Sequence, residues 1–173
     1  MPADPLRALV DATREGDDRA LAELVRQTQP VVWRVCSALG SAGEVEDLVQ
    51  ETYLRAVRAL DSYRGDAPFR AWLVSIARRV CADHVRRRQR GRRLVERLVR
   101  DLSEASVPPG EHFDDLLRAI DPDRREAFVL TQLVGLSYDE AAVTLGCPIG
   151  TVRSRVARAR ADLATAVRRA ESR

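Results

Sequence analysis

Residues 135–160 constrain the fold of this chain more than any other stretch of its sequence. Ser137 and Glu140 stand three residues apart in front of apolar positions, which is the pattern of a capping box that begins a helix. Gly-Cys-Pro at 146–148 predicts the end of that helix, because proline disfavours the helical conformation in the residue before it. A second helix is expected from Thr151. Two short helices joined by a tight turn predict a helix-turn-helix.

The expected second helix has an apolar side and a basic side. Its apolar residues between Val152 and Leu163 recur at steps of four, three and four, which at about 100° per residue places them on one face. Small and basic side chains facing the other way suit a DNA major groove, with flanking arginines on phosphates. The alternative is an arginine-rich surface that faces only water. The candidate DNA-contacting residues are Thr151, Arg153, Ser154, Arg155, Ala157 and Arg158.

Helical patterns also fill the rest of the chain, and no run of alternating β-branched residues predicts a strand. We expect an all-α fold of two small helical domains, residues 1–94 and 113–173, the second being the helix-turn-helix. Residues 95–112, which contain Pro-Pro-Gly, are expected to form a flexible linker. The other expected helices cover residues 6–13, 19–28, 31–39, 44–60 and 68–93, one that resumes near 113, and one that starts at 121–122.

Charge is distributed unevenly, although the formal net charge is only +3. Residues 70–100 hold eleven arginines against two acids, and residues 150–173 hold seven against two. Acids outnumber arginines in both remaining parts, residues 1–69 and 101–149. Two basic blocks that alternate with two acidic blocks predict two separate contacts with nucleic acid and other surfaces for a different partner.

The expected helix 44–60 has a polar, acidic face around one exposed leucine. Such a face is typical of a contact patch for a basic partner helix, or of an ordinary solvated surface. The candidate residues for this contact are Asp47, Gln50, Glu51 and Leu54.

The stretch from residue 62 to 93 combines aromatic side chains with arginines around a glycine turn. Aromatic groups among cations suit unpaired bases, which can stack or flip into a pocket. The alternative is that Phe69 and Trp72 are core anchors, which we favour for Trp72. The candidate residues for contact with an unpaired strand are Tyr63, Arg64, Asp66, Phe69, Trp72, Arg78, Arg79 and Arg86.

The sequence predicts neither a metal site nor a cofactor. Three cysteines, odd in number and far apart, argue against a disulfide framework and fit a reducing cytosol. Cys81 and His84 lie one helical turn apart, but no further cysteine or histidine stands nearby to complete a metal site. No signal peptide and no run of roughly 18 apolar residues is present, so we expect a cytoplasmic protein without membrane insertion.

Three segments resemble the bacterial extracytoplasmic-function (ECF) sigma factors, the smallest class of RNA polymerase specificity subunits. They are EDLVQETY at residues 46–53, AWLVSIAR at 71–78, and LSYDEAA with GTVRSR at 136–142 and 150–155. Each segment alone is moderately specific, but their order and spacing match the family over nearly the whole chain.

The resemblance implies a protein that binds core RNA polymerase at the clamp coiled coil and the flap and directs promoter-specific initiation. Asp47, Gln50, Glu51 and Leu54 would dock on the clamp. The loop at 63–69 would receive a flipped non-template base of the single-stranded −10 element, supported by arginines of the following helix. The helix-turn-helix would read the double-stranded −35 element. Such proteins are usually held by an anti-sigma factor. Arg79 stands where the family often has asparagine, which predicts an altered −10 preference.

Two other functions are compatible with parts of the sequence. A stand-alone helix-turn-helix transcriptional regulator would use residues 135–160 but leave residues 62–93 unexplained. An enzyme acting on DNA, such as a recombinase, would need a nucleophile beside a base, and no serine or tyrosine is so placed. We therefore assign no catalytic residues.

Overall fold

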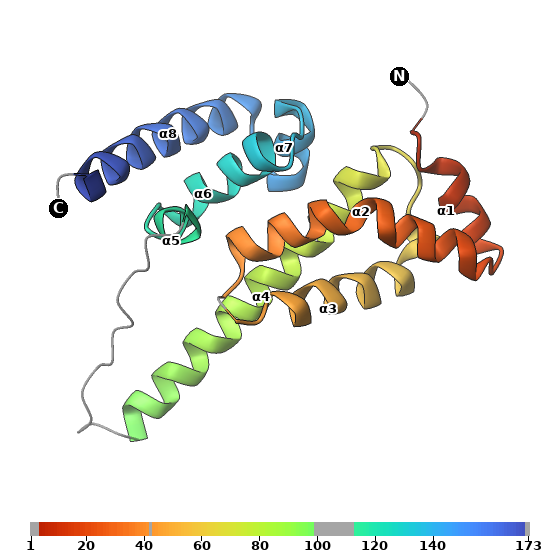
Figure 1. Cartoon of the computed structure of the whole chain (residues 1–173), viewed down its shortest axis with the longest axis horizontal. Coiled ribbons are helices and arrows are strands. Elements are labelled where there is room, and N and C mark those ends of the chain that lie inside the picture. Colours follow the sequence, from red (N-terminus) through yellow and green to blue (C-terminus); the bar gives the residue numbers. More distant parts are fainter. Residues whose placement is uncertain (1–3, 42, 99–112, 172–173) are drawn as a thin grey trace.

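The computed structural model describes residues 4–41, 43–98 and 113–171, which fold into helices with no strand among them (Figure 1). The expected all-α fold is confirmed. The α-helices are α1 (Arg7–Arg14), α2 (Asp18–Leu39), α3 (Val45–Arg58), α4 (Phe69–Leu98), α5 (Phe113–Arg118), α6 (Pro122–Phe128), α7 (Tyr138–Leu145) and α8 (Ile149–Glu171), with a 3-10 turn η1 (Leu60–Ser62) and a π-helical turn η2 (Val129–Leu133).

Helix α2 corrects one prediction. Residues 19–28 and 31–39 were expected as two helices with Pro30 at the start of the second, but α2 runs unbroken through Pro30. The Asp17 side chain caps its beginning by accepting hydrogen bonds from two backbone N–H groups, those of Arg19 and Ala20, at 2.8 and 3.1 Å. Pro30 is exposed, and buried residues on both sides of it hold the helix against its neighbours. Tertiary packing therefore outweighs the hydrogen bond that the proline cannot donate.

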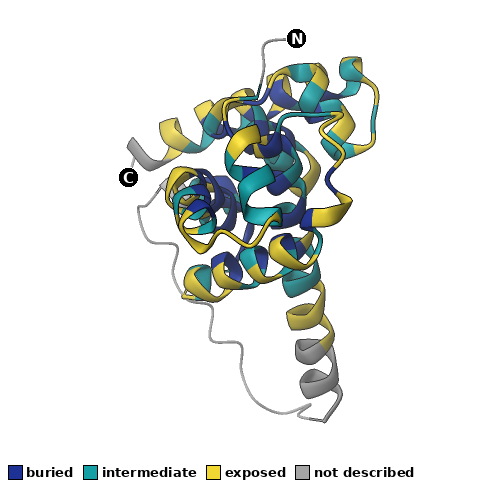
Figure 2. Cartoon of the chain, turned by 90° about the vertical axis from the view of Figure 1, so that its right-hand side faces the viewer, coloured by how far each residue is buried: buried dark blue, intermediate teal, exposed yellow. Residues whose placement is uncertain are grey.

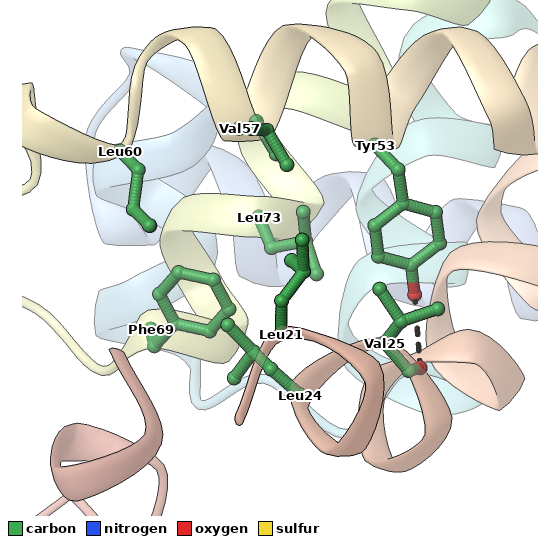
Figure 3. Close-up of a pocket in the computed structure, with 9 residues that line it drawn as sticks. Leu21, Leu24, Val25, Tyr53, Val57, Leu60, Phe69 and Leu73 are labelled. Carbon is green, nitrogen blue, oxygen red and sulfur yellow. Dashed lines mark hydrogen bonds between the residues drawn. The ribbon is translucent and has the colours of Figure 1, made fainter. Parts of the chain in front are cut away.

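Helices α2, α3 and α4 pack around the apolar core of the N-terminal part. Side chains from all three meet in the region drawn in Figure 3, where the Tyr53 hydroxyl points at the Val25 carbonyl oxygen at 3.4 Å. The cavity between them measures about 10 Å³, about the space that one water needs. This core is a packed support for the surfaces above it rather than a ligand site.

Helices α5 to α8 form the C-terminal part around their own buried side chains. Leu117 of α5, Leu130 of η2 and Val152 of α8 are fully buried there. Helix α6 begins at the capping residue Asp121, which accepts a hydrogen bond from the Arg124 backbone at 3.2 Å, as its Asp-Pro sequence predicts.

The N-terminal and C-terminal parts pack against each other. Helix α2 contacts α5 and η2, and α4 contacts α7. The Arg70 guanidinium donates a hydrogen bond to the Val134 carbonyl oxygen at 2.5 Å. The predicted end of the first domain at residue 94 falls inside α4, and residues 99–112 of the predicted linker lie outside the described part of the chain. The domain boundaries stay a prediction.

Candidate nucleic-acid interfaces

The helix-turn-helix forms as its local sequence predicts. Ser137 Oγ accepts a hydrogen bond from the Glu140 backbone N–H at 3.2 Å, and the Glu140 carboxylate accepts one from the Ser137 backbone N–H at 2.7 Å. This reciprocal pair is the predicted capping box of α7. Gly146 ends α7 in the left-handed region at φ 64°, a conformation that glycine adopts without strain. Helix α8 then begins at Ile149, two residues before the predicted start.

Replacing Ser137 with alanine is expected to lower the free energy of unfolding by about 1 kcal/mol, because the Glu140 backbone N–H in the first turn of α7 loses the side-chain oxygen that caps it. Thermal unfolding followed by circular dichroism measures the change. Ser154→Ala in α8 is the matched control, since Ser154 is exposed and its hydroxyl donates a hydrogen bond to the Thr151 carbonyl oxygen of its own helix rather than capping a helix end. Equal stabilities of the two variants would contradict a stabilising role for the capping box.

The two sides of α8 are divided as predicted. Its apolar side is buried against the C-terminal part, and Arg153, Ser154, Ala157 and Arg158 are exposed on the other side. Thr151 and Arg155 are half-buried instead. The Arg155 guanidinium is paired with the Asp123 carboxylate of α6 and lies 3.8 Å from the Cys147 sulfur. Arg155 therefore braces the helix-turn-helix, while Arg153, Ser154, Ala157 and Arg158 form the exposed side of α8.

The acidic face of α3 is open to solvent over most of its length. Asp47 and Gln50 are exposed, and Leu54 is 47% exposed. Glu51 differs, because its carboxylate accepts a hydrogen bond from Arg55 at 2.7 Å, and Arg55 also donates to Asp83 of α4 at 2.9 Å. These two bonds keep the Arg55 pKa above its ordinary value. Glu51 is thus turned toward α4 and away from the centre of the face.

Val57 was missed in the sequence analysis of this face. It is 47% exposed, equal to Leu54, and stands three residues further along α3. The spacing could have predicted its exposure, because residues 50, 54 and 57 recur at steps of four and three and therefore share one side of the helix. Leu54 and Val57 give this face two exposed apolar side chains, which suit a protein contact. Val57 also lines the small core cavity beside Leu21 and Leu73 (Figure 3), so it lies where the face meets α2.

The aromatic residues of the loop at 63–69 pack into the protein. Tyr63 and Phe69 are only 4% and 2% exposed, with ring centroids 5.4 Å apart in an edge-to-face arrangement. Trp72 is half-buried beside them, as the anchor interpretation favoured. Arg64 and Asp66 are exposed. The rings therefore shape the loop from within, and the charged side chains face outward.

Helix α4 carries the expected arginines, but in different surroundings. Arg79 and Arg86 are exposed, and Arg86 pairs with Asp83 of its own helix at 2.6 Å. Arg78 is half-buried and forms an ion pair with Glu126 of α6 at 2.9 Å. Residues 86–90 of α4 are all exposed (Figure 2).

A cleft of about 690 Å³ separates the start of α4 from α7. It brings together three of the candidate strand-contacting residues, Asp66, Trp72 and Arg79, on one wall. The opposite wall includes Asp139 and Val143 of α7, and Val143 is 79% exposed. Tyr63, Phe69, Arg78 and Arg86 do not line this cleft. The sequence offered no sign of it, because its two walls lie about 70 residues apart in the chain.

Cys81 and His84 each have a partner within the protein. The Cys81 thiol is hydrogen-bonded to the thiol of Cys36, and this bond together with burial raises the pKa of Cys81. His84 Nε2 lies 2.7 Å from the Glu44 carboxylate, which also accepts a hydrogen bond from Arg88 at 2.9 Å. Among the described residues, no group of three or more His, Cys, Asp or Glu side chains is placed to hold a metal ion. In the same residues, no helix has the length and apolar character to cross a membrane.

Comparison with known proteins assigns both parts of the chain. Residues 24–91 match Sigma-70 region 2, and residues 111–163 match Sigma-70 region 4. The ECF RNA polymerase sigma factor SigC of Mycobacterium tuberculosis is 40% identical over 163 residues, which cover 91% of this chain and 88% of that protein. The chain belongs to the ECF family of RNA polymerase sigma factors. Region 2 contains α3, α4 up to residue 91 and the loop between them, and region 4 contains the helix-turn-helix.

Solved structures of sigma factors have the same fold. CnrH, solved in complex with the cytosolic domain of CnrY, superimposes with a TM-score of 0.72 at 32% identity, over 93% of this chain and 96% of that one. The sigma factor RpoE of Bartonella quintana, solved with the anti-sigma factor NepR, gives a TM-score of 0.67 at 30% identity, over 85% and 95%. As an ECF sigma factor, this protein directs promoter-specific transcription initiation. A stand-alone regulator would not account for the region 2 match.

Proposed function

We propose that this sigma factor works through three separate surfaces in the cytoplasm. The α3 face of Asp47, Gln50 and Leu54 docks on the clamp coiled coil of core RNA polymerase, with Val57 as a second exposed apolar side chain and Glu51 at its margin. The exposed side of α8 reads the double-stranded −35 element. The loop at 63–69 and the arginines of α4 hold the single-stranded non-template −10 element.

The proposal depends above all on the exposed side of α8. Helix α8 follows the capped helix α7 and buries its own apolar face, and it presents Arg153, Ser154, Ala157 and Arg158 outward. Arginine side chains on such a helix can bind phosphates and the edge of guanine, and small residues beside them allow the helix to approach the bases. Thr151 and Arg155 are half-buried at the edge of this surface, where Arg155 supports it through its ion pair with Asp123.

The region 2 surface suits a strand that has lost its pairing. Removing a base from its stack costs a few kcal/mol, so a melted strand must gain contacts that offset this cost. Arg64 and Asp66 are exposed on the loop, Arg79 and Trp72 line the adjoining cleft, and Arg78 and Arg86 follow along α4. Tyr63 and Phe69 contribute by giving the loop its shape. Binding and holding DNA requires no nucleophile, so no catalytic residue is assigned.

Two protein partners belong to the proposal. Core RNA polymerase contacts the α3 face and, through its flap, region 4. The second is an anti-sigma factor, because the RpoE protein of Bartonella quintana, which shares this fold, was solved with one.

A run-off transcription assay tests the proposal. The purified protein is mixed with sigma-free core RNA polymerase and a genomic promoter library, without any inhibitor present. We expect promoter-directed transcripts that require both the −35 and the −10 sequence. Binding to duplex DNA without any initiation would contradict the proposal and support a regulator that acts alone.

A further inference from the structure

Asp4 lies at the beginning of the described chain and joins the two ends of the loop at 63–69. Its Oδ2 atom accepts a hydrogen bond from the Phe69 backbone N–H at 2.6 Å and one from the Tyr63 hydroxyl at 3.1 Å. Its Oδ1 atom accepts a hydrogen bond from the Leu6 backbone N–H at 3.0 Å, which fixes the carboxylate relative to α1. One side chain thus bridges two residues that lie about 60 positions away in the sequence.

Both contacts use a carboxylate oxygen of Asp4 as the acceptor. Phe69 is the first residue of α4, where backbone N–H groups lack partners within the helix and attract negative charge. Proline at position 68 has no side-chain oxygen that could cap this helix locally. The Tyr63 phenol is buried, and burial together with the hydrogen bond to Asp4 raises its pKa to about 12. Tyr63 therefore keeps its hydroxyl proton at neutral pH. The hydroxyl can donate a hydrogen bond to Asp4 or to the Ala67 carbonyl oxygen, which lies at 2.8 Å.

Helix α1 supports the same loop through a second residue. The Arg14 guanidinium donates hydrogen bonds to the Leu60 carbonyl oxygen at 2.8 Å and to the Tyr63 carbonyl oxygen. It also lies over the Tyr63 ring, 5.9 Å from its centroid. The N-terminal segment thus holds the buried side of the loop, while Arg64 and Asp66 are exposed.

We propose that Asp4 is a positioning residue for −10 recognition, which sets the shape of the base-receiving loop by tying Tyr63 at its start to Phe69 at its end. This inference rests on the proposed function of the loop. Asp4 itself does not contact DNA, and its effect passes through the backbone of residues 63–69. Loss of the tie widens the choice of base at the −10 element while leaving the surfaces on α3 and α8 unchanged.

The test uses Asp4→Ala, Asp4→Asn and, as a matched control, Asp18→Ala in the full-length protein. Asp18 is an exposed acid in the first turn of α2, so the control removes the same charge away from the loop. Run-off transcription with core polymerase compares a promoter with variants carrying each other base at the captured −10 position. We expect Asp4→Ala to lower the discrimination between bases roughly tenfold, the size expected for a hydrogen bond to a charged group. Asp4→Asn, which keeps one acceptor oxygen, is expected to lie between Asp4→Ala and the wild type.

Three further measurements separate positioning from general stability. Affinity for core polymerase and affinity for a −35 duplex should stay within about twofold of wild type, because the hydrogen bonds of Asp4 go to Leu6, Tyr63 and Phe69, outside both surfaces. Amide hydrogen exchange should accelerate at Phe69, by about tenfold in Asp4→Ala, while the interior of α4 stays protected.

Separate outcomes decide the inference and the function on which it rests. Unchanged base discrimination in Asp4→Ala would overturn the inference. A parallel loss of −10 base discrimination, affinity for core polymerase and affinity for the −35 duplex would overturn it as well. If the wild-type protein gives no promoter-directed transcript, the proposed function fails. Exchange at Phe69 then still decides whether Asp4 holds the loop, and unchanged exchange would show that it does not.

Discussion

Replacing Asp47 with arginine is expected to abolish co-purification of this sigma factor with core RNA polymerase. Asp47 is exposed in the first turn of α3, and it borders the exposed Gln50 and Leu54 on the proposed docking face. A basic partner helix would meet a positive charge in place of a negative one. Close charge pairs across interfaces contribute about 1.5–7 kcal/mol, so reversal of one charge is expected to weaken binding by more than about tenfold.

A control for this variant has to change the same charge without reaching the docking face. Asp18→Arg meets that need, because Asp18 is likewise an exposed acid in the first turn of a helix. It should co-purify with polymerase like the wild type, and both variants should unfold at similar temperatures. Retention of Asp47→Arg on immobilised core polymerase at the wild-type level would remove the docking claim for α3.

Replacing Arg158 with alanine is expected to abolish much of the preference for the −35 element. Arg158 is exposed on the same side of α8 as Ser154 and Ala157, opposite the buried residues. A bidentate arginine contact to guanine is worth about 1–3 kcal/mol of discrimination against the wrong base. The ratio of affinities for matched and scrambled −35 duplexes should therefore fall by about tenfold or more. Fluorescence anisotropy of labelled duplexes at a fixed salt concentration measures both affinities.

Arg169→Ala supplies the comparison for this measurement. Arg169 is an exposed arginine in the last turn of the same helix, outside the proposed reading surface. Removal of the Arg169 side chain should lower the affinity for both duplexes equally or leave both unchanged, since phosphate contacts carry no sequence information. An equal loss for matched and scrambled duplexes in Arg158→Ala would assign Arg158 to the phosphates as well. Binding of Arg158→Ala to core polymerase should be unchanged in either case.

Predictions that depended on neighbouring residues in the chain agreed with the structure. The capping box at Ser137 and Glu140 and the division of α8 into a buried and an exposed side both follow from spacings of three and four residues. The α3 face could be predicted in the same way, and the same rule would have added Val57. Such features depend on helical geometry alone, so a single sequence contains them.

Features that depended on distant residues could not be predicted. The sequence indicated a nucleic-acid contact for Tyr63 and left Phe69 open between such a contact and a core anchor, whereas packing against α1, α2 and Trp72 buries both rings. The continuity of α2 through Pro30 likewise comes from tertiary packing, which overrides the local preference of proline. The bond from Phe69 to Asp4 spans 65 residues, and nothing in a local pattern indicates it.

The ion pair between Arg78 and Glu126 has a consequence for how promoter DNA gains access. Both side chains are about one-quarter exposed. Glu126 forms an ion pair with the Arg78 guanidinium, which the proposed contact with the non-template strand would need. If Arg78 supports the strand as proposed, a DNA phosphate and the Glu126 carboxylate would compete for one guanidinium, and the strand would bind it only after the ion pair to region 4 breaks. The free energy needed to break that ion pair would then lower the affinity of the free protein for −10 DNA. Polymerase that already holds the regions apart would remove that penalty before the promoter arrives.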